Sequence, residues 1–152
     1  MRRPDTPPGT SAAIGAALYG LATRAARRLP RDMSLTSAAT LATLDRTGPR
    51  RITDLAAVEG VTQPAMTTLV RVMEESGLVE RRGDASDKRV TLVCLTEAGA
   101  SYVRTRRQAG IHAFERLIGR LTGDEVEALA AALPALEHLA ALEGQDREGP
   151  RR

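Results

Sequence analysis

The chain changes its hydrophobic period at Gly77, and no other feature limits its possible folds so strongly. Residues 62–76 carry apolar side chains at helical spacing, and Gly77 stands where a left-handed helix end is expected. The short segments 78–82 and 90–95, which suit strands, then flank a polar loop with turn residues. The pattern predicts a helix followed directly by a β-hairpin with an exposed, charged tip.

Helices are also predicted before this point, over about 11–29, 34–45 and 52–58, because each segment repeats apolar residues at helical spacing. Ser34 suits the N-cap of the second helix, and Thr62 suits the N-cap of the fourth. The residues expected to face inward are Leu35, Ala38, Leu41, Leu44, Ile52, Leu55, Ala56, Met66, Leu69, Val70 and Met73.

Two more helices are predicted after the hairpin, over about 97–121 and 124–142. Thr122, followed three residues later by Glu125, forms a capping box that opens the last helix, and Pro134 should kink or split it. The apolar faces of both helices are interpreted as core or as a dimer seam. The residues expected to be buried late in the first of them are Ile111, Phe114, Leu117, Ile118 and Leu121, and Thr96 is its expected cap.

Charge is distributed unevenly along the 152 residues, whose net charge is +3. Residues 1–31 carry six Arg against one acid, and residues 78–107 carry seven Lys or Arg against four acids. Residues 108–152, in contrast, carry five Arg against eight acids. Modest basicity permits nucleic-acid binding, and the acidic C-terminal third is a poor candidate for contacting phosphate.

The remaining composition favours a cytoplasmic protein without a membrane partner. The single cysteine, Cys94, excludes an internal disulfide and fits a reducing compartment. No apolar run approaches the length of a membrane span, and Pro and Gly follow the basic N-terminus where a signal peptide would be apolar. Hydrophobic residues make up 42% of the chain, which is enough for a core, so global disorder is not expected.

The outer face of the helix over 62–76 has the chemistry of a surface that reads DNA. An α-helix fits the major groove, and its first turn reaches the base edges. The face offers uncharged hydrogen-bonding side chains and one cation, whereas Glu74 and Glu75 come only in the last turn. The alternative, a merely solvated helix, would more often scatter Glu and Lys along its whole outer face. The residues predicted to contact DNA here are Thr62, Gln63, Pro64, Thr67, Thr68 and Arg71.

The predicted hairpin adds a second basic surface, because cations on such a wing can reach phosphates or an adjacent minor groove. Its cations are Arg81, Arg82, Lys88 and Arg89, and Arg81, Lys88 and Arg89 are the predicted contacts. Asp87 and Asp84 are expected to hold the arginine side chains or the turn itself. A surface salt bridge from Arg89 to Asp87 is the alternative role for Arg89, and both roles can hold at once.

The hairpin and its flanks resemble the MarR family of winged helix-turn-helix regulators. Residues 87–96, DKRVTLVCLT, resemble the family's D-x-R-x5-L-T wing signature. Residues 75–81, ESGLVER, are similar to the family's segment after the recognition helix, and residues 97–99, EAG, to its L-T-x-x-G start of a long helix. The resemblance extends over about 11–143.

The resemblance implies a homodimer whose first, fifth and sixth helices form the apex of a roughly triangular assembly. The two recognition helices would enter successive major grooves of a pseudopalindromic operator, with Arg89 in the minor groove and Asp87 holding it. Family members usually repress genes, and many release DNA on binding small phenolic or lipophilic compounds or on cysteine oxidation. We therefore expect a nucleoid-associated repressor whose partners are double-stranded DNA, a second copy of the chain and a small-molecule effector.

Three other residues are interpreted as structural. Cys94 lies in a predicted strand, and a half-buried structural role is favoured over redox sensing. His112 and His138 lie on different helices without further ligands at suitable spacing, so neither a metal site nor a cofactor is expected.

Two function classes compete with a ligand-responsive regulator. No nucleophile with a base, phosphate loop or paired carboxylates is present, so an enzyme is not expected. The second rival is a winged helix used for protein contact or for architectural DNA binding without sequence preference. Tyr19, Thr23 and Arg27, at helical spacing on the first helix, are candidates to line an effector cleft, with ordinary packing as the alternative.

These observations predict a mainly α-helical fold with a small β-hairpin wing. Residues 34–96 would form the winged helix-turn-helix lobe that binds DNA. Residues 11–31 and 97–143 would form a helical dimerisation region, and 1–10 and 144–152 would be flexible termini.

Overall fold

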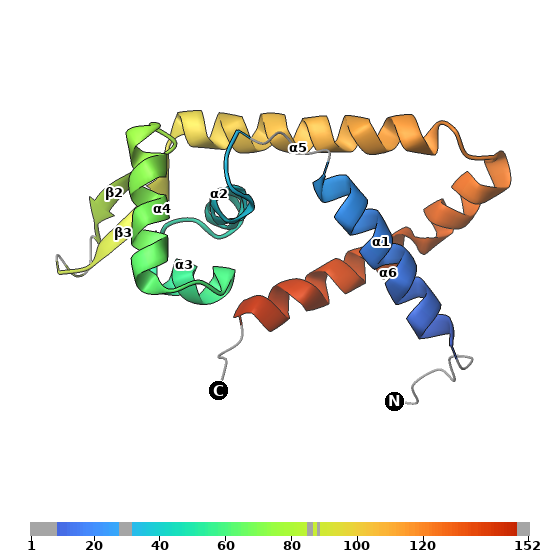
Figure 1. Ribbon diagram of the computed structural model, residues 1–152, viewed down its shortest axis with the longest axis horizontal. Helices are drawn as coiled ribbons and strands as arrows, with labels where there is room; N and C mark the ends of the chain where they lie inside the picture. The colour runs from blue at the N-terminus through green and yellow to red at the C-terminus, as the bar shows by residue number, and fades with distance from the viewer. Residues whose placement is uncertain (1–8, 28–31, 85–86, 88, 149–152) are drawn as a thin grey trace. The chain divides into compact units, whose positions relative to one another are not determined.

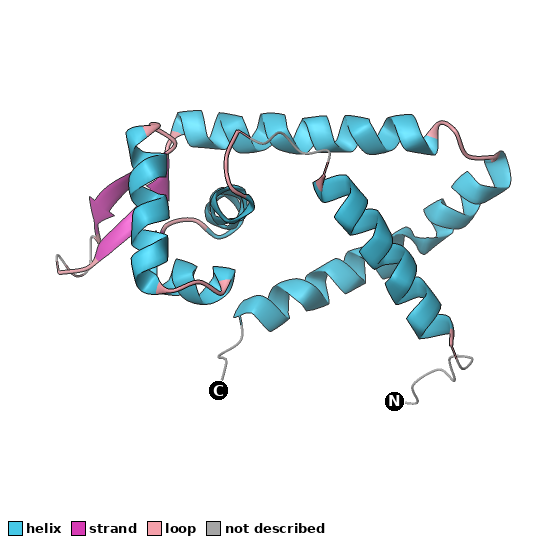
Figure 2. Ribbon diagram, in the orientation of Figure 1, coloured by secondary structure: helices cyan, strands magenta, loops and turns pink. Residues whose placement is uncertain are grey.

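The computed structural model describes residues 9–27, 32–84, 87 and 89–148, and among these the side chains of 143 and 145–148 are left aside. The described residues form helices and a small antiparallel sheet (Figures 1 and 2), as the sequence predicts. The elements are α1 (Thr10–Ala26), α2 (Leu35–Thr47), β1 (Arg50–Arg51), α3 (Ile52–Glu59), α4 (Gln63–Glu75), β2 (Val79–Gly83), β3 (Thr91–Leu95), α5 (Glu97–Ile118) and α6 (Gly123–Glu148).

Contacts within the chain divide it into two units, residues 1–33 and residues 34–152. The first unit holds α1, whose described side chains are exposed or half-buried within it. The second unit holds the remaining helices and the sheet, and each unit is described by itself.

Both ends of α4 form as the sequence predicts. The Thr62 hydroxyl oxygen accepts a hydrogen bond from the Ala65 N–H at 3.4 Å. At the other end Gly77 has a φ of 71°, which lets the Leu78 N–H donate to the Met73 carbonyl at 2.9 Å. The other predicted caps also form. They are Ser34, Thr96 and the reciprocal pair of Thr122 and Glu125.

The sheet has the strand order β1-β3-β2, and all neighbours are antiparallel. The strands β2 and β3 confirm the predicted hairpin. The strand β1 was not predicted, because two residues are too few to show an alternating pattern. It pairs Arg50 with Val93 and Arg51 with Leu92, so that it fixes the start of α3 to the central strand of the wing.

The core of the second unit lies between α2, α3, α4 and the sheet, and aliphatic side chains fill it. Its polar members are satisfied, since the fully buried Thr40 hydroxyl donates to the Thr36 carbonyl at 2.8 Å.

Two expectations are wrong. Leu35 is 62% exposed because it lies on the opposite side of α2 from Ser37, and Cys94 is buried rather than half-buried. The buried hydrophobic residues are Leu41, Leu44, Leu55, Ala56, Met66, Val70, Met73, Val79, Val93 and Cys94.

Thr96 and Gly99 join the end of α4 to the start of α5. The Thr96 hydroxyl donates to the Gly77 carbonyl at 2.7 Å, with the Leu78 carbonyl at 3.1 Å, and accepts from the Gly99 N–H at 3.0 Å. The backbone of Gly99 approaches so closely that a β-carbon there would lie 2.0 Å from the Leu78 carbonyl oxygen. A residue without a side chain is therefore required at this joint.

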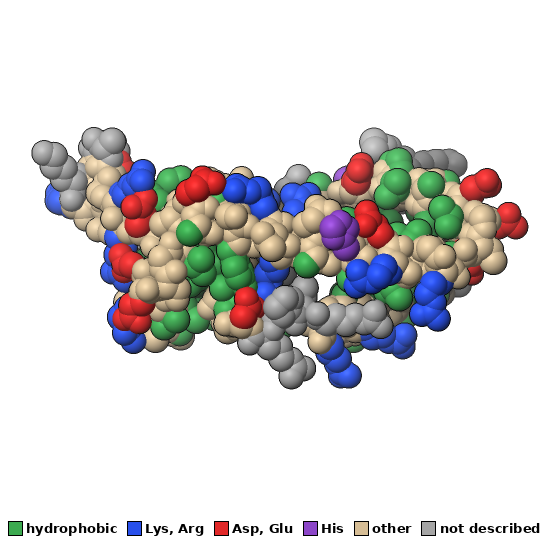
Figure 3. Space-filling model, turned by 90° about the horizontal axis from the view of Figure 1, so that it is seen from above, with side chains coloured by type: hydrophobic (Ala, Val, Ile, Leu, Met, Phe, Trp, Pro, Cys, Tyr) green, Lys and Arg blue, Asp and Glu red, His purple; other side chains and the backbone are tan. Residues whose placement is uncertain are grey.

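The apolar faces of α5 and α6 are largely open to solvent within the described chain (Figure 3). The expectation that the later half of α5 is buried is wrong for this single chain, because helical periodicity identifies an apolar face but not what covers it. The exposed apolar residues are Ile111, Phe114, Ile118, Leu121, Val126, Leu129, Leu133, Leu136, Leu139 and Leu142, while Leu117 is half-buried.

The last helix is longer than predicted. It is not split at Pro134, which removes only one backbone donor from the helical ladder. It continues to Glu148, so residues 144–148 lie in the helix rather than in a tail that begins at 144. Residues 149–152 lie outside the described residues.

Candidate nucleic-acid interface

The structure brings the predicted DNA-contacting residues of α4 onto one exposed face. Met66, Val70 and Met73 anchor the opposite face in the core. Because the cap at Thr62 starts the helix at Gln63, the side chains of Gln63 and Pro64 in the first turn are exposed to solvent. All the predicted residues of this helix, Thr62, Gln63, Pro64, Thr67, Thr68 and Arg71, are exposed.

The two threonines of this face have a defined hydrogen-bonding direction. The Thr67 hydroxyl donates to the Gln63 carbonyl at 2.9 Å, and the Thr68 hydroxyl donates to the Pro64 carbonyl at 3.1 Å. Since a hydroxyl has one proton, these oxygens are left as acceptors toward solvent. The sequence indicated hydrogen-bonding side chains here, and the structure limits them to accepting, with a methyl group beside each oxygen.

Arg71 is held by a carboxylate on the same helix face. Its Nη1 lies 2.6 Å from Oε1 of Glu75, one turn further along α4. Both side chains remain about three-fifths exposed, at 62% and 60%. The guanidinium has five N–H donors, so the bond to Glu75 leaves donors free for another acceptor.

The arginines of β2 point to different partners. Arg81 Nε lies 3.2 Å from Oε2 of Glu74, which ties the strand to the last turn of α4. The ion pair links two elements of the second unit. The Arg81 side chain is 35% exposed, so Arg81 also stays a candidate DNA contact. Arg82 forms an ion pair with Glu80 on its own strand.

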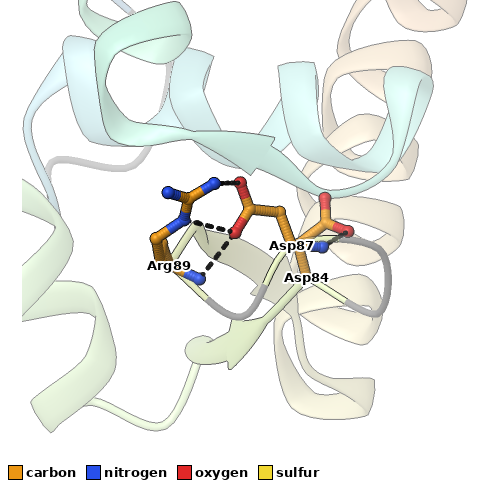
Figure 4. A network of polar contacts seen from close by, with 3 residues as sticks. All are labelled: Asp84, Asp87 and Arg89. Atoms are coloured by element: carbon orange, nitrogen blue, oxygen red, sulfur yellow. Dashed lines mark hydrogen bonds and ion pairs between the residues drawn. The ribbon is translucent and has the colours of Figure 1, made fainter.

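At the wing tip, Asp87 holds Arg89, as the sequence suggested (Figure 4). Oδ1 of Asp87 accepts from the Arg89 backbone N–H at 3.0 Å and from Nε at 3.1 Å, and Oδ2 accepts from Nη2 at 3.4 Å. Asp84 accepts from the Asp87 N–H at 3.4 Å, which helps to shape the turn. The Arg89 side chain is nevertheless 91% exposed, and Lys88 lies outside the described residues.

These hydrogen bonds lower the pKa of Asp87. The side-chain and backbone hydrogen bonds from Arg89 are the largest causes, and the charge of Arg51 acts in the same direction. The carboxylate is therefore ionised at neutral pH. The pair persists above the usual carboxyl pKa of 3.8 and is lost only as the pH falls through the lowered value.

Sequence reasoning missed Arg51, which the structure places on the wing. Arg51 and Arg82 both lie opposite Leu92, so the two arginines are on the same face of the sheet on either side of β3. The only signal in the sequence is the basic run Arg50-Arg51 directly before Ile52, and its meaning depends on the unpredicted strand β1.

The candidate effector residues all lie on α1. Tyr19 is 73% exposed, and the Thr23 hydroxyl donates to the Tyr19 carbonyl at 2.9 Å. Arg27 caps the C-terminal end of the helix and is exposed. Within the first unit these side chains share an open surface, and their role as a cleft stays a prediction.

Among the described residues, no three or more His, Cys, Asp or Glu side chains gather closely enough to hold a metal ion. None of the helices in the described ranges is long and apolar enough to cross a membrane.

The helix pair α3 and α4, with the three-stranded wing beside them, defines a winged helix-turn-helix protein. Residues 33–91 match the family model described as the MarR family. Over these residues the chain is similar to the MarR family of transcriptional regulators. This similarity agrees with the predicted resemblance to winged helix-turn-helix regulators.

Individual relatives show the same similarity. The uncharacterized HTH-type transcriptional regulator YfiV of Bacillus subtilis (strain 168) is 29% identical over 117 residues, which cover 77% of this chain and 72% of the relative. A MarR family protein from Bacillus stearothermophilus shares the fold at 19% identity, with a TM-score of 0.71, over 87% of this chain and 96% of that one. A mutant of S. aureus MepR bound to an oligodeoxyribonucleotide has 24% identity and a TM-score of 0.63, over 87% of this chain and 96% of that one.

Proposed function

We propose that this chain is a sequence-selective DNA-binding repressor that acts as a homodimer on a pseudopalindromic operator. One observation carries the proposal: the first turns of α4 present uncharged hydrogen-bonding groups and one guanidinium, while the opposite face anchors the helix in the core. A helix with this face fits the major groove, and the Arg89 wing beside it suits the backbone or minor groove. The MepR mutant bound to an oligodeoxyribonucleotide has a similar fold, which supports DNA as the binding partner.

The dimer is supported by the uncovered apolar residues of three helices. Ile14 and Leu21 of α1 are exposed, as are the apolar residues of late α5 and of α6. Exposed aliphatic side chains repeated along a helix are typical of a surface that a partner covers. A second copy of the chain is the occupant that a pseudopalindromic site requires, because each half-site needs its own α4.

Selection from a pool of random duplexes at moderate ionic strength tests this function. A regulator should enrich one sequence with two related half-sites and should bind it by orders of magnitude more tightly than random DNA. A winged helix that serves architecture or protein contact should enrich nothing. That outcome would remove the regulatory proposal and leave the fold assignment intact.

Replacing base-reading side chains should relax the preference at single operator positions. Gln63→Ala and Arg71→Ala should each cost about 1–3 kcal/mol of operator binding, because each removes hydrogen bonds to a base edge. Binding to the selected duplex and to single-position variants of it measures both effects. If both variants bind the selected duplex as the wild type does, α4 does not lie in the groove as proposed.

Arg89 should contribute mainly through its charge. Arg89→Ala should weaken binding to selected and random duplexes alike and make the salt dependence shallower by about one unit, since one phosphate contact is lost. Arg120→Ala, which removes the same charge from the turn between α5 and α6, is the matched control and should leave the slope unchanged. A slope that Arg89→Ala does not alter would exclude this role.

An effector is the remaining part of the proposal. A small lipophilic or phenolic compound that binds near Tyr19, Thr23 and Arg27 would change DNA affinity by shifting the spacing of the two α4 helices, with a coupling of about 1–3 kcal/mol. Screening small aromatic acids for loss of operator binding tests this part. As a regulator of transcription, the protein would be found with the nucleoid.

A further inference from the structure

We propose that Glu75 is a positioning residue that fixes the Arg71 guanidinium for reading a guanine, and so determines sequence preference without contacting DNA itself. The inference rests on the proposed function and deepens it. It starts from the ion pair between Arg71 Nη1 and Glu75 Oε1, at 2.6 Å on the exposed face of α4. Neither the sequence pattern nor the family resemblance assigned a role to this glutamate.

A stabilising role does not account for the pair. Both side chains are about 60% exposed, and exposed ion pairs one turn apart on a helix contribute little to folding stability. An uncompensated carboxylate on the DNA-facing side of α4 would also be repelled by phosphates. The glutamate is tolerated there because Arg71 covers its charge.

The geometry allows Arg71 to bind Glu75 and a base at the same time. One nitrogen, Nη1, is committed to the carboxylate, and the guanidinium still has donors for the O6 and N7 acceptors of guanine. Holding the planar group in one orientation reduces the side-chain entropy that the base contact would otherwise cost. It also keeps Arg71 away from the phosphates, which it could bind on any sequence.

Glu75→Gln should therefore tighten binding to a scrambled duplex more than to the duplex selected from the random pool. The affinity for the selected duplex divided by the affinity for the scrambled duplex should fall about three- to tenfold. A change of this size is expected for the loss of one oriented charged contact. The relaxed preference should appear at the single position that Arg71→Ala also relaxes, and not at the position that Gln63→Ala relaxes. The melting temperature should stay close to that of the wild type.

Two controls separate positioning from simple charge. Glu127→Gln makes the same change on α6, where the carboxylate is exposed, and should leave the affinity ratio unchanged. In an Arg71→Ala background, Glu75→Gln should no longer change the ratio, because its effect passes through Arg71.

Each other outcome overturns the inference. An equal gain on both duplexes, or an effect that persists without Arg71, would show that Glu75 acts only by repelling DNA. A higher ratio in Glu75→Gln would show that the carboxylate competes with the base for Arg71. If the wild type itself does not prefer the selected duplex, the proposed function falls, whereas a preference that Glu75→Gln leaves unchanged removes only this inference.

Discussion

Replacing Gly99 by alanine should lower the free energy of unfolding by about 1–3 kcal/mol, even though alanine is the better helix former. The added β-carbon would lie 2.0 Å from the Leu78 carbonyl oxygen and 2.9 Å from Cδ1 of Leu95. The first of these is a backbone atom that accepts from Thr96, so it cannot move aside without breaking the joint between α4 and α5. Chemical denaturation followed by circular dichroism measures the change.

A glycine of the same helix provides the control for this experiment. A β-carbon at Gly110 would meet no atom within 4 Å, so Gly110→Ala should gain helix propensity without a clash and stabilise the protein by up to about 1 kcal/mol. Opposite signs for the two substitutions are the expected result. If Gly99→Ala were neutral, the close approach of α5 to Leu78 would not be a feature of the folded protein.

The second large effect concerns the uncovered apolar face of α6. Leu129→Glu should convert a dimer into a monomer, because it places a charge where the second copy is proposed to bury an exposed leucine. Binding to the two-half-site duplex should then weaken about 100-fold or more, since linking two binding modules raises avidity by about that factor. Analytical ultracentrifugation and titration with whole and half operators measure the two consequences.

The same substitution at another exposed leucine controls for charge and solubility. Leu35 is 62% exposed at the start of α2, where an acid suits the helix dipole. Leu35→Glu should leave the oligomeric state unchanged. A wild-type protein that sediments as a monomer at micromolar concentration would contradict the dimer, and so would a Leu129→Glu variant that remains dimeric.

The parts of the fold that depend on neighbouring residues were predictable from the sequence. The caps at Ser34, Thr62, Thr96 and Thr122 and the left-handed glycine at the end of α4 each rest on side chains within a few positions. The hairpin followed because the hydrophobic period changes at Gly77. These local signals were enough to predict which face of α4 is exposed and which is buried.

Features that depend on distant contacts were not predictable. The strand β1 exists only because β3 pairs with it, and this pairing brings Arg51 to the wing. The apolar stripe of late α5 was expected to be buried, yet periodicity does not specify whether the same chain or another covers it. The Arg71–Glu75 pair depends on side-chain rotamers, and the sequence indicated only that the acid lies one turn away.

Hydroxyl-radical footprinting of the protein on its selected duplex tests most directly whether α4 reads the major groove with the wing beside it. Two protected regions related by a dyad are expected, with centres about one helical turn (10 base pairs) or a multiple of it apart. Arg89→Ala should remove the outermost protection alone. Uniform protection along the duplex, or a single region without symmetry, would show that two α4 helices do not read the operator in this way.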